Sequence, residues 1–210
     1  MKSKYFSEFL GTAFLFCTVV GSGIMGQNLS SNDSLTLLAN TLATVFALYF
    51  LITIFGDHSS HFNPVVSMVM LVRKEITTQV CTVFIILQIS GAILGVMLAN
   101  YIFELDPVYF SEKPRSGTHL FVSEILATFG LLTVILLSSK EKVAVTVAAY
   151  IGAAYWFTSS TSFANPAGTI GRSFSNTFAG ISTNDILHFC VAQLIGALFA
   201  LLIYNKCFKK

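Results

Sequence analysis

Long apolar runs separated by short polar segments dominate the chain. A helix that spans the hydrocarbon core of a bilayer needs about 20 mostly apolar residues. The pattern therefore predicts an all-α membrane protein with six transmembrane helices. The predicted helices cover residues 6–25, 40–55, 78–103, 118–137, 143–157 and 185–204.

Two shorter apolar pieces, residues 63–72 and 165–174, follow the second and fifth long runs. Each is about 15 Å long as a helix, which is half the thickness of the hydrocarbon core. Each begins with Asn-Pro. Asparagine is a favoured N-cap residue and proline a favoured first helical residue, so both pieces are predicted to be half-helices.

The composition supports a membrane protein. Hydrophobic residues make up 54% of the 210 residues and charged residues only 10%, against about 25% in an ordinary soluble domain. The net charge of +2 is too small to indicate a nucleic-acid partner, which a strongly basic surface would bind. The four cysteines form no CxxC pair, so free thiols are expected and no cofactor is implied. Glu8 and the lack of a cleavage site indicate that the first apolar run is retained as a span.

The distribution of basic residues predicts the orientation. With the N-terminus inside, nine of the 12 Lys and Arg residues fall in inner segments. This bias predicts a multi-pass protein of the inner or plasma membrane with both termini in the cytoplasm. The three outer basic residues are Lys113, Arg115 and Arg172.

The two halves of the chain repeat three motifs in the same order. The pairs are EFLGT at 8–12 with EILAT at 124–128, HFNPV at 61–65 with FANPA at 163–167, and QISGA at 88–92 with QLIGA at 193–197. Each half holds three spans, an odd number, so the second half must be inverted relative to the first. We therefore predict one channel domain over 1–210, with inverted repeats at about 1–105 and 118–210. Inverted repeats place the functional site near the bilayer midplane.

The two Asn-Pro turns predict how that site works. In an inverted repeat the half-helices enter from opposite sides, so their N-termini meet near the midplane. The amides of Asn63 and Asn165 can donate to passing hydroxyl groups, while positive potential and desolvation oppose cations and interrupt a proton wire. The expected function is a passive pore for small uncharged solutes that excludes protons and ions.

These features resemble the major intrinsic proteins, the aquaporins and aquaglyceroporins, over essentially the whole chain. The resemblance rests on the six-span inverted repeat, His61-Phe62-Asn63-Pro64, Asn165-Pro166-Ala167, and the glutamate of each half. It implies a homotetramer with one pore per subunit, no cofactor and no enzymatic activity. It also implies that Glu8 and Glu124 brace the loops before the half-helices by accepting backbone hydrogen bonds.

Two positions depart from the family pattern. The first motif has Val65 where the family usually has alanine, and the second has Gly168 where it usually has a selectivity-filter arginine. Arg172, four positions later, lies on the same helix face. We expect its guanidinium to lean through the space vacated at Gly168 toward the filter. The alternative is that Arg172 caps loop carbonyls or meets lipid headgroups.

Family spacing, carried back from the asparagines, places the other filter residues at Ala43, Ala153 and Ser162. Together with the glycine of the second motif they would form a wide ring, which favours solutes larger than water. Phe46 or Phe50 would intrude if the register of the second span were wrong by a turn.

The solute itself stays open at this stage. The sequence from 165 to 172 resembles a bacterial branch of the family that is linked to metalloid handling, so neutral arsenite joins water and glycerol-like polyols as a candidate. The rival function is an ion- or proton-coupled secondary transporter. Coupling would need ionisable residues inside the bundle, and only Glu8 and Glu124, both in bracing positions, qualify.

One histidine has two further interpretations. Asp57, His58 and His61 lie close together, but three donors in one turn are a weak metal signal and we predict no metal site. His61 is instead expected to line the cytoplasmic vestibule, where it could act as a protonation gate.

Overall fold

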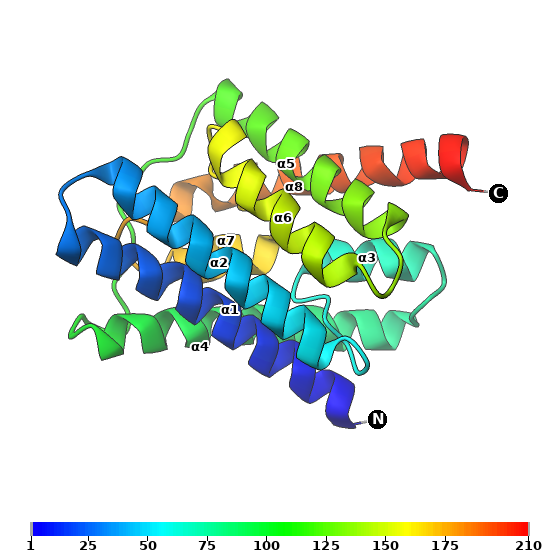
Figure 1. Ribbon diagram of the computed structural model, residues 1–210, viewed down its shortest axis with the longest axis horizontal. Coiled ribbons are helices and arrows are strands. Elements are labelled where there is room, and N and C mark those ends of the chain that lie inside the picture. The colour runs from blue at the N-terminus through cyan, green and yellow to red at the C-terminus, as the bar shows by residue number, and fades with distance from the viewer. Residues whose placement is uncertain (1, 210) are drawn as a thin grey trace.

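The computed structural model describes residues 2–209, and within this range the chain forms eight α-helices (Figure 1). A 3-10 turn at Thr183–Asp185 precedes the last helix and a π-helical turn at Tyr204–Phe208 follows it. The helices are α1 Lys2–Leu29, α2 Asp33–Phe55, α3 Pro64–Val72, α4 Thr78–Ile102, α5 Thr118–Leu137, α6 Val143–Phe157, α7 Pro166–Arg172 and α8 Ile186–Ile203.

The predicted all-helical arrangement is confirmed, with six helices on the six apolar runs and α3 and α7 on the two short pieces. The largest difference in boundary is at α2, which begins at Asp33 and not near residue 40. The reason is local: the Asn32 side chain accepts hydrogen bonds from the backbone N–H groups of Ser34 (2.9 Å) and Leu35 (3.4 Å), which starts the helix there.

Five of the described helical segments are long and apolar enough to cross a membrane, namely α1, α2, α4, α5 and the continuous segment Thr183–Phe208 that contains α8. The sixth predicted span, α6, has 15 residues, about 22 Å of helix. It is shorter because the chain leaves the helix at Thr158 and runs back into the bundle toward α7.

Glycines allow the closest helix contacts. A Cβ atom added at Gly95 in α4 would lie 2.1 Å from the carbonyl oxygen of Ala13 in α1. In the second half, a Cβ at Gly196 in α8 would lie 2.4 Å from the carbonyl oxygen of Ile125 in α5. Small residues at such crossings bring backbones together, so α1 lies along α4 and α5 along α8 (Figure 1).

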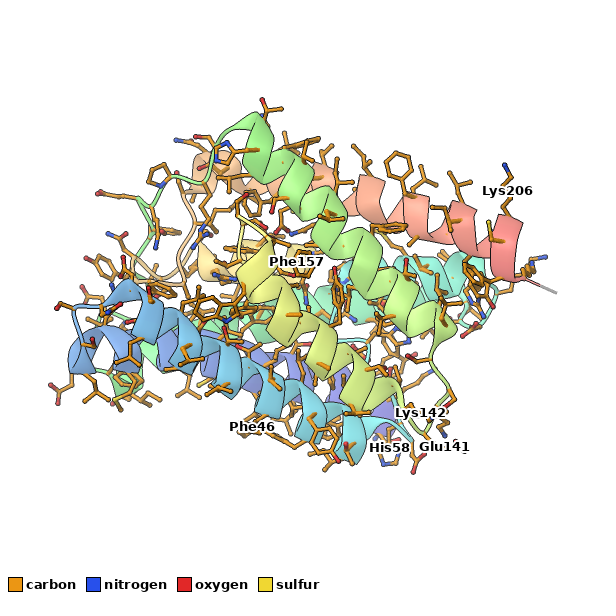
Figure 2. The ribbon with its side chains drawn as sticks, turned by 45° about the horizontal axis from the view of Figure 1, so that its top comes forward. Phe46, His58, Glu141, Lys142, Phe157 and Lys206 are labelled. Atoms are coloured by element: carbon orange, nitrogen blue, oxygen red, sulfur yellow. The ribbon has the colours of Figure 1, made fainter. Side chains whose placement is uncertain are left out.

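The outside of the bundle is apolar along its length and charged at its ends. Phe46 and Phe157 lie on the outer surface, as Figure 2 shows, and are 64% and 53% exposed. His58, Lys142 and Lys206 lie at the end of the molecule that also holds both termini (Figures 1 and 2). An apolar belt between polar ends suits a bilayer.

Candidate functional site

The two half-helices begin where their asparagine side chains cap them. The Asn63 Oδ1 atom accepts a hydrogen bond from the backbone N–H of Val65 at 3.1 Å. The Asn165 Oδ1 atom accepts from the N–H groups of Ala167 at 3.0 Å and Gly168 at 3.2 Å. A proline follows each asparagine as the first helical residue, where its missing N–H leaves no partner unsatisfied.

The same two asparagines join the half-helices to each other. Asn63 Nδ2 donates to the carbonyl oxygen of Ala164 at 2.7 Å, and Asn165 Nδ2 donates to the carbonyl oxygen of Phe62 at 2.8 Å. Each side chain therefore holds the loop that precedes the other half-helix, so the two N-termini abut. An amide NH₂ has two hydrogens, and one on each asparagine remains available to a solute.

The Glu8 carboxylate in α1 holds the loop before α3. Its Oε1 accepts hydrogen bonds from Ser59 Oγ at 2.5 Å and from the backbone N–H of His61 at 2.7 Å. Its Oε2 accepts from the backbone N–H of Phe62 at 2.8 Å and from Gln88 Nε2 at 2.7 Å. These bonds satisfy a carboxylate that is fully buried and would otherwise be costly at this depth.

The Glu124 carboxylate in α5 does the same for the loop before α7. It accepts from the backbone N–H groups of Phe163 and Ala164, both at 2.9 Å, and from Gln193 Nε2 at 2.7 Å. Gln193 Nε2 also donates to Thr169 Oγ1 at 3.0 Å. Corresponding residues of the two halves thus make corresponding bonds.

Backbone strain marks both loops. Phe62 and Ala164, the residues just before the two asparagines, have φ angles of 49° and 46°. A non-glycine residue in this region costs about 1–3 kcal/mol and persists only where its surroundings enforce it. Here the glutamate bonds enforce it, and the strained residues turn their carbonyl oxygens toward the asparagine amides.

A cavity of about 190 Å³ runs past the meeting point of the half-helices. Apolar side chains such as Leu15, Val19 and Ile151 form much of its wall. Its polar lining residues include Thr44, His61, Asn63, Tyr155, Ser162, Asn165 and Arg172. A passage with one apolar side and a row of hydrogen-bonding groups suits a small solute that has both kinds of surface.

The placement of Ala43 and Ala153 in the filter is wrong. Neither lines the cavity; Ala153 is exposed on the outside of α6 and Ala43 is half-buried. The cavity is lined instead by Thr44 and Tyr155, whose hydroxyl oxygens lie 3.1 Å apart. A helix turns about 100° per residue, so a shift of one or two residues moves a side chain from the lumen to the outer surface. Hydroxyl groups within apolar spans were the signal that could have identified this pair.

The space beside Gly168 is filled by an aromatic ring. A Cβ atom at Gly168 would lie 2.2 Å from Phe16 Cζ, and Phe16 lines the cavity from α1. The expectation that Arg172 leans through this space is therefore wrong. Phe46 and Phe50 do not intrude, because both are exposed on the outside of α2, at 64% and 43%.

Arg172 nevertheless lines the cavity. It is 4% exposed, which excludes contact with lipid headgroups. Its Nε atom donates to the carbonyl oxygen of Ala179 at 2.5 Å, so it does cap a loop carbonyl. The guanidinium carbon lies 3.3 Å from the ring centroid of Phe163, a cation–π contact that helps to hold a buried cation.

His61 lines the same cavity, on the side of α3. Its Nδ1 atom lies 3.0 Å from Ser67 Oγ, and its ring contacts the Phe84 ring edge-on. Asp57 pairs with Lys140 at the surface, away from this ring. Among residues 2–209, no group of three or more His, Cys, Asp or Glu side chains has a geometry that could hold a metal ion.

Comparison with known proteins agrees with this geometry. The major intrinsic protein family matches residues 1–204. The aquaglyceroporin AqpS of Rhizobium meliloti (strain 1021) is 47% identical over 93% of this chain and 85% of its own length. The probable aquaporin TIP2-2 of Arabidopsis thaliana is 27% identical over 97% of this chain and 86% of its own.

A solved structure shares the fold. The X-ray structure of the aquaglyceroporin from Plasmodium falciparum superimposes with a TM-score of 0.73 and 21% sequence identity, covering 98% of this chain and 96% of that one. The likeness extends over the entire bundle, half-helices included. With the family match over residues 1–204, the conclusion is that the chain belongs to the major intrinsic protein family.

Proposed function

We propose that the protein is a passive membrane channel for water and glycerol-like polyols. The observation that carries this proposal is the reciprocal contact of Asn63 and Asn165, which sets two amide donors side by side on one small cavity. Membership of a channel family and 47% identity to an aquaglyceroporin support it.

The wall of the cavity explains why polyols fit. Asn63 and Asn165 offer N–H groups to solute oxygens, while Leu15, Val19 and Ile151 offer an apolar surface to solute carbons. On the side of the asparagines, a polyol thus exchanges hydrogen bonds to water for hydrogen bonds to fixed N–H donors. On the apolar side, its carbons need no hydrogen bonds, so little interaction with water is lost. Neutral arsenite, a small centre ringed by hydroxyls, has a similar size and hydrogen-bonding pattern, and we include it as a further solute.

The same geometry opposes protons and cations. Water oxygens that accept from the two asparagines are held with their hydrogens pointing away from the midplane, which interrupts a proton wire. The buried cation of Arg172 repels positive ions in the lumen. Glu8 and Glu124 are occupied by the backbone of the two loops, so neither is free to carry a coupling proton.

The outer part of the lumen is the proposed selectivity filter. Here Thr44, Tyr155, Ser162 and Arg172 present hydroxyl and guanidinium groups, and Phe163 presents its ring. A tyrosine at this level makes the passage narrower than the ring of Ala43, Ala153, Ser162 and Gly168 expected from the sequence. Three hydroxyls and a guanidinium match a solute with several oxygens better than they match a purely apolar one.

The test is reconstitution into liposomes with stopped-flow light scattering. Shrinkage in sucrose measures water flux, re-swelling in glycerol and in urea measures solute flux, and arsenite uptake is measured separately. We expect glycerol flux that is linear with gradient and has a low activation energy. Flux that saturates and collapses with an uncoupler would instead establish a coupled transporter.

Two arginine variants sharpen the test. Arg172→Ala is expected to admit potassium or protons, because the repelling charge is removed from the lumen. Arg73→Ala is the matched control, since Arg73 lies outside the cavity and pairs with Glu75. Equal ion leak through both variants would contradict the role given to Arg172.

We further propose a plasma-membrane location with both termini cytoplasmic, and a homotetrameric assembly. Lys142 and Lys206 lie at the end that holds both termini, which supports the orientation (Figure 2). Cys207 is exposed near the C-terminus, so a membrane-impermeant maleimide should label it in cells only after permeabilisation. Native mass spectrometry of the solubilised protein tests the tetramer.

A further inference from the structure

Three cations converge on three successive carbonyl groups beside the proposed selectivity filter. The carbonyl oxygens belong to residues 178–180, in the loop after α7. Lys113 Nζ donates to the first at 2.9 Å, Arg172 Nε to the second at 2.5 Å and Arg115 Nε to the third at 2.7 Å. One short backbone segment therefore gathers three positive charges, two from the loop between α4 and α5 and one from α7.

Among residues 2–209, no acidic side chain forms an ion pair with this cluster. In the part of the chain that the structure describes, the ion pairs are Arg73–Glu75 and Lys140–Asp57, both elsewhere. The carboxylate of Asp185 accepts the backbone N–H of Arg115, not its guanidinium. Burial of cations that have carbonyl partners but no ion-pair partner is costly.

The charges also act on one another. Burial, together with the positive charges of Arg115 and Arg172, lowers the pKa of Lys113 to about 8. Burial lowers the pKa of Arg115 to about 10. In both cases burial outweighs the favourable charges of nearby carboxylates, which are Asp33 for Lys113 and Glu124 and Asp185 for Arg115.

Donors remain unused on the cavity side of the cluster. The protein bond of Arg172 uses Nε alone, and a guanidinium has five N–H donors. Ser162 lines the same cavity, is 4% exposed, and its Oγ atom has no hydrogen-bond partner. A buried hydroxyl without a partner indicates a missing ligand or water. The two residues thus present a planar donor fork and a hydroxyl donor to the same cavity.

We propose that this end of the cavity binds a small oxyanion or carboxylate, and that the bound anion occludes the solute pathway. Guanidinium and hydroxyl donors form short, charge-assisted bonds to such oxygens, and Lys113 and Arg115 add favourable potential. Neutral polyols use the same donors but without the charge, so they leave faster. Because Arg172 is buried in the cavity, the ligand is a soluble anion and not a lipid headgroup. The occlusion part rests on the proposed channel function.

Calorimetric titration of the detergent-solubilised full chain with inorganic phosphate, at ionic strength held constant with potassium chloride, tests the site. Saturable binding is expected, weakened about fivefold in Lys113→Met through loss of one nearby charge. Ser162→Ala should weaken it too. Lys140→Met, the same substitution at an exposed lysine away from the cavity, should bind like the wild type. Absence of saturable heat, or equal affinity in all four proteins, overturns the site.

Glycerol flux in proteoliposomes with phosphate on both sides tests occlusion. Flux, normalised for each variant to its phosphate-free value, should fall saturably with phosphate, and half-inhibition should need about fivefold more phosphate in Lys113→Met. Lys140→Met should match the wild type. A wild type that conducts no glycerol without phosphate refutes the channel proposal, while calorimetry still decides the site. Conduction that phosphate leaves unchanged refutes occlusion.

Discussion

The Glu124 carboxylate offers a sharp test of how the second half-helix loop is held. Its Oε1 accepts the backbone N–H of Phe163, and its Oε2 accepts that of Ala164 as well as Gln193 Nε2. The substitution Glu124→Gln replaces one oxygen with an NH₂ group. Whichever way this new amide turns, one backbone N–H then faces another donor and loses its partner.

The structure sets the size of the effect. A hydrogen bond to a charged group contributes about 1.5–3 kcal/mol, and one such bond must be lost. The contact with Gln193 can survive, because its Oε1 has no partner and a flip of its amide restores a donor–acceptor pair. We therefore expect the free energy of unfolding to fall by about 2 kcal/mol.

The assay is reversible unfolding by SDS in mixed micelles, followed by circular dichroism. Glu8→Gln should show a similar loss, since each Glu8 oxygen also accepts one backbone N–H. Glu141→Gln, at an exposed turn, is the control and should leave unfolding unchanged. A change below about 0.5 kcal/mol in Glu124→Gln would refute the view that these backbone bonds hold the loop.

Three other predictions concern single contacts. Gly168→Ala should lower the free energy of unfolding by about 1–3 kcal/mol, since its Cβ would meet the Phe16 ring at 2.2 Å. Adding Phe16→Leu to this variant should recover most of the loss. If the losses of the two single variants simply add in the double variant, the clash is contradicted. Lys113 should be half-maximally reactive toward an acylating reagent near its pKa of about 8, measured by peptide mass spectrometry. A lysine in the unfolded chain has a pKa of about 10.4, so the unfolded state binds more protons than the folded state between about pH 8 and this value. The free energy of unfolding should therefore rise with pH in that window. A reactivity midpoint near pH 10 would show that Lys113 is not buried beside other cations. Tyr155→Phe should lower glycerol flux about fivefold by removing a lumen hydroxyl, whereas Tyr101→Phe, at a residue 68% exposed, should match the wild type. Equal glycerol flux in the two variants would show that Tyr155 is not part of the filter.

Much of the architecture could be predicted from the chain because it depends on local rules. Apolar runs long enough to span a bilayer became helices on the predicted residues. The two Asn-Pro pairs became capped helix starts, since a cap needs only the residue itself and the next few N–H groups. A glutamate isolated within a span needs hydrogen-bond partners inside the bundle. Backbone N–H groups of the two loops are these partners.

The filter is where sequence reasoning was least accurate. Spacing carried from the family pointed to Ala43 and Ala153, but Thr44 and Tyr155 line the cavity. Spacing along the chain gives the height of a residue to within one helical turn, whereas the direction of its side chain changes by about 100° with each residue. The rotation of α2 and α6 is set by their contacts with neighbouring helices, which no local pattern encodes.

The sequence by itself determined the spans, the two half-helices, their asparagine caps and the presence of one basic residue near the second motif. Only the tertiary structure decided what surrounds that residue. Phe16 comes from α1 to fill the space beside Gly168, and the carbonyl of Ala179 and the ring of Phe163 hold Arg172 at the cavity. These contacts join segments far apart in the chain, so they exist only once the helices have packed.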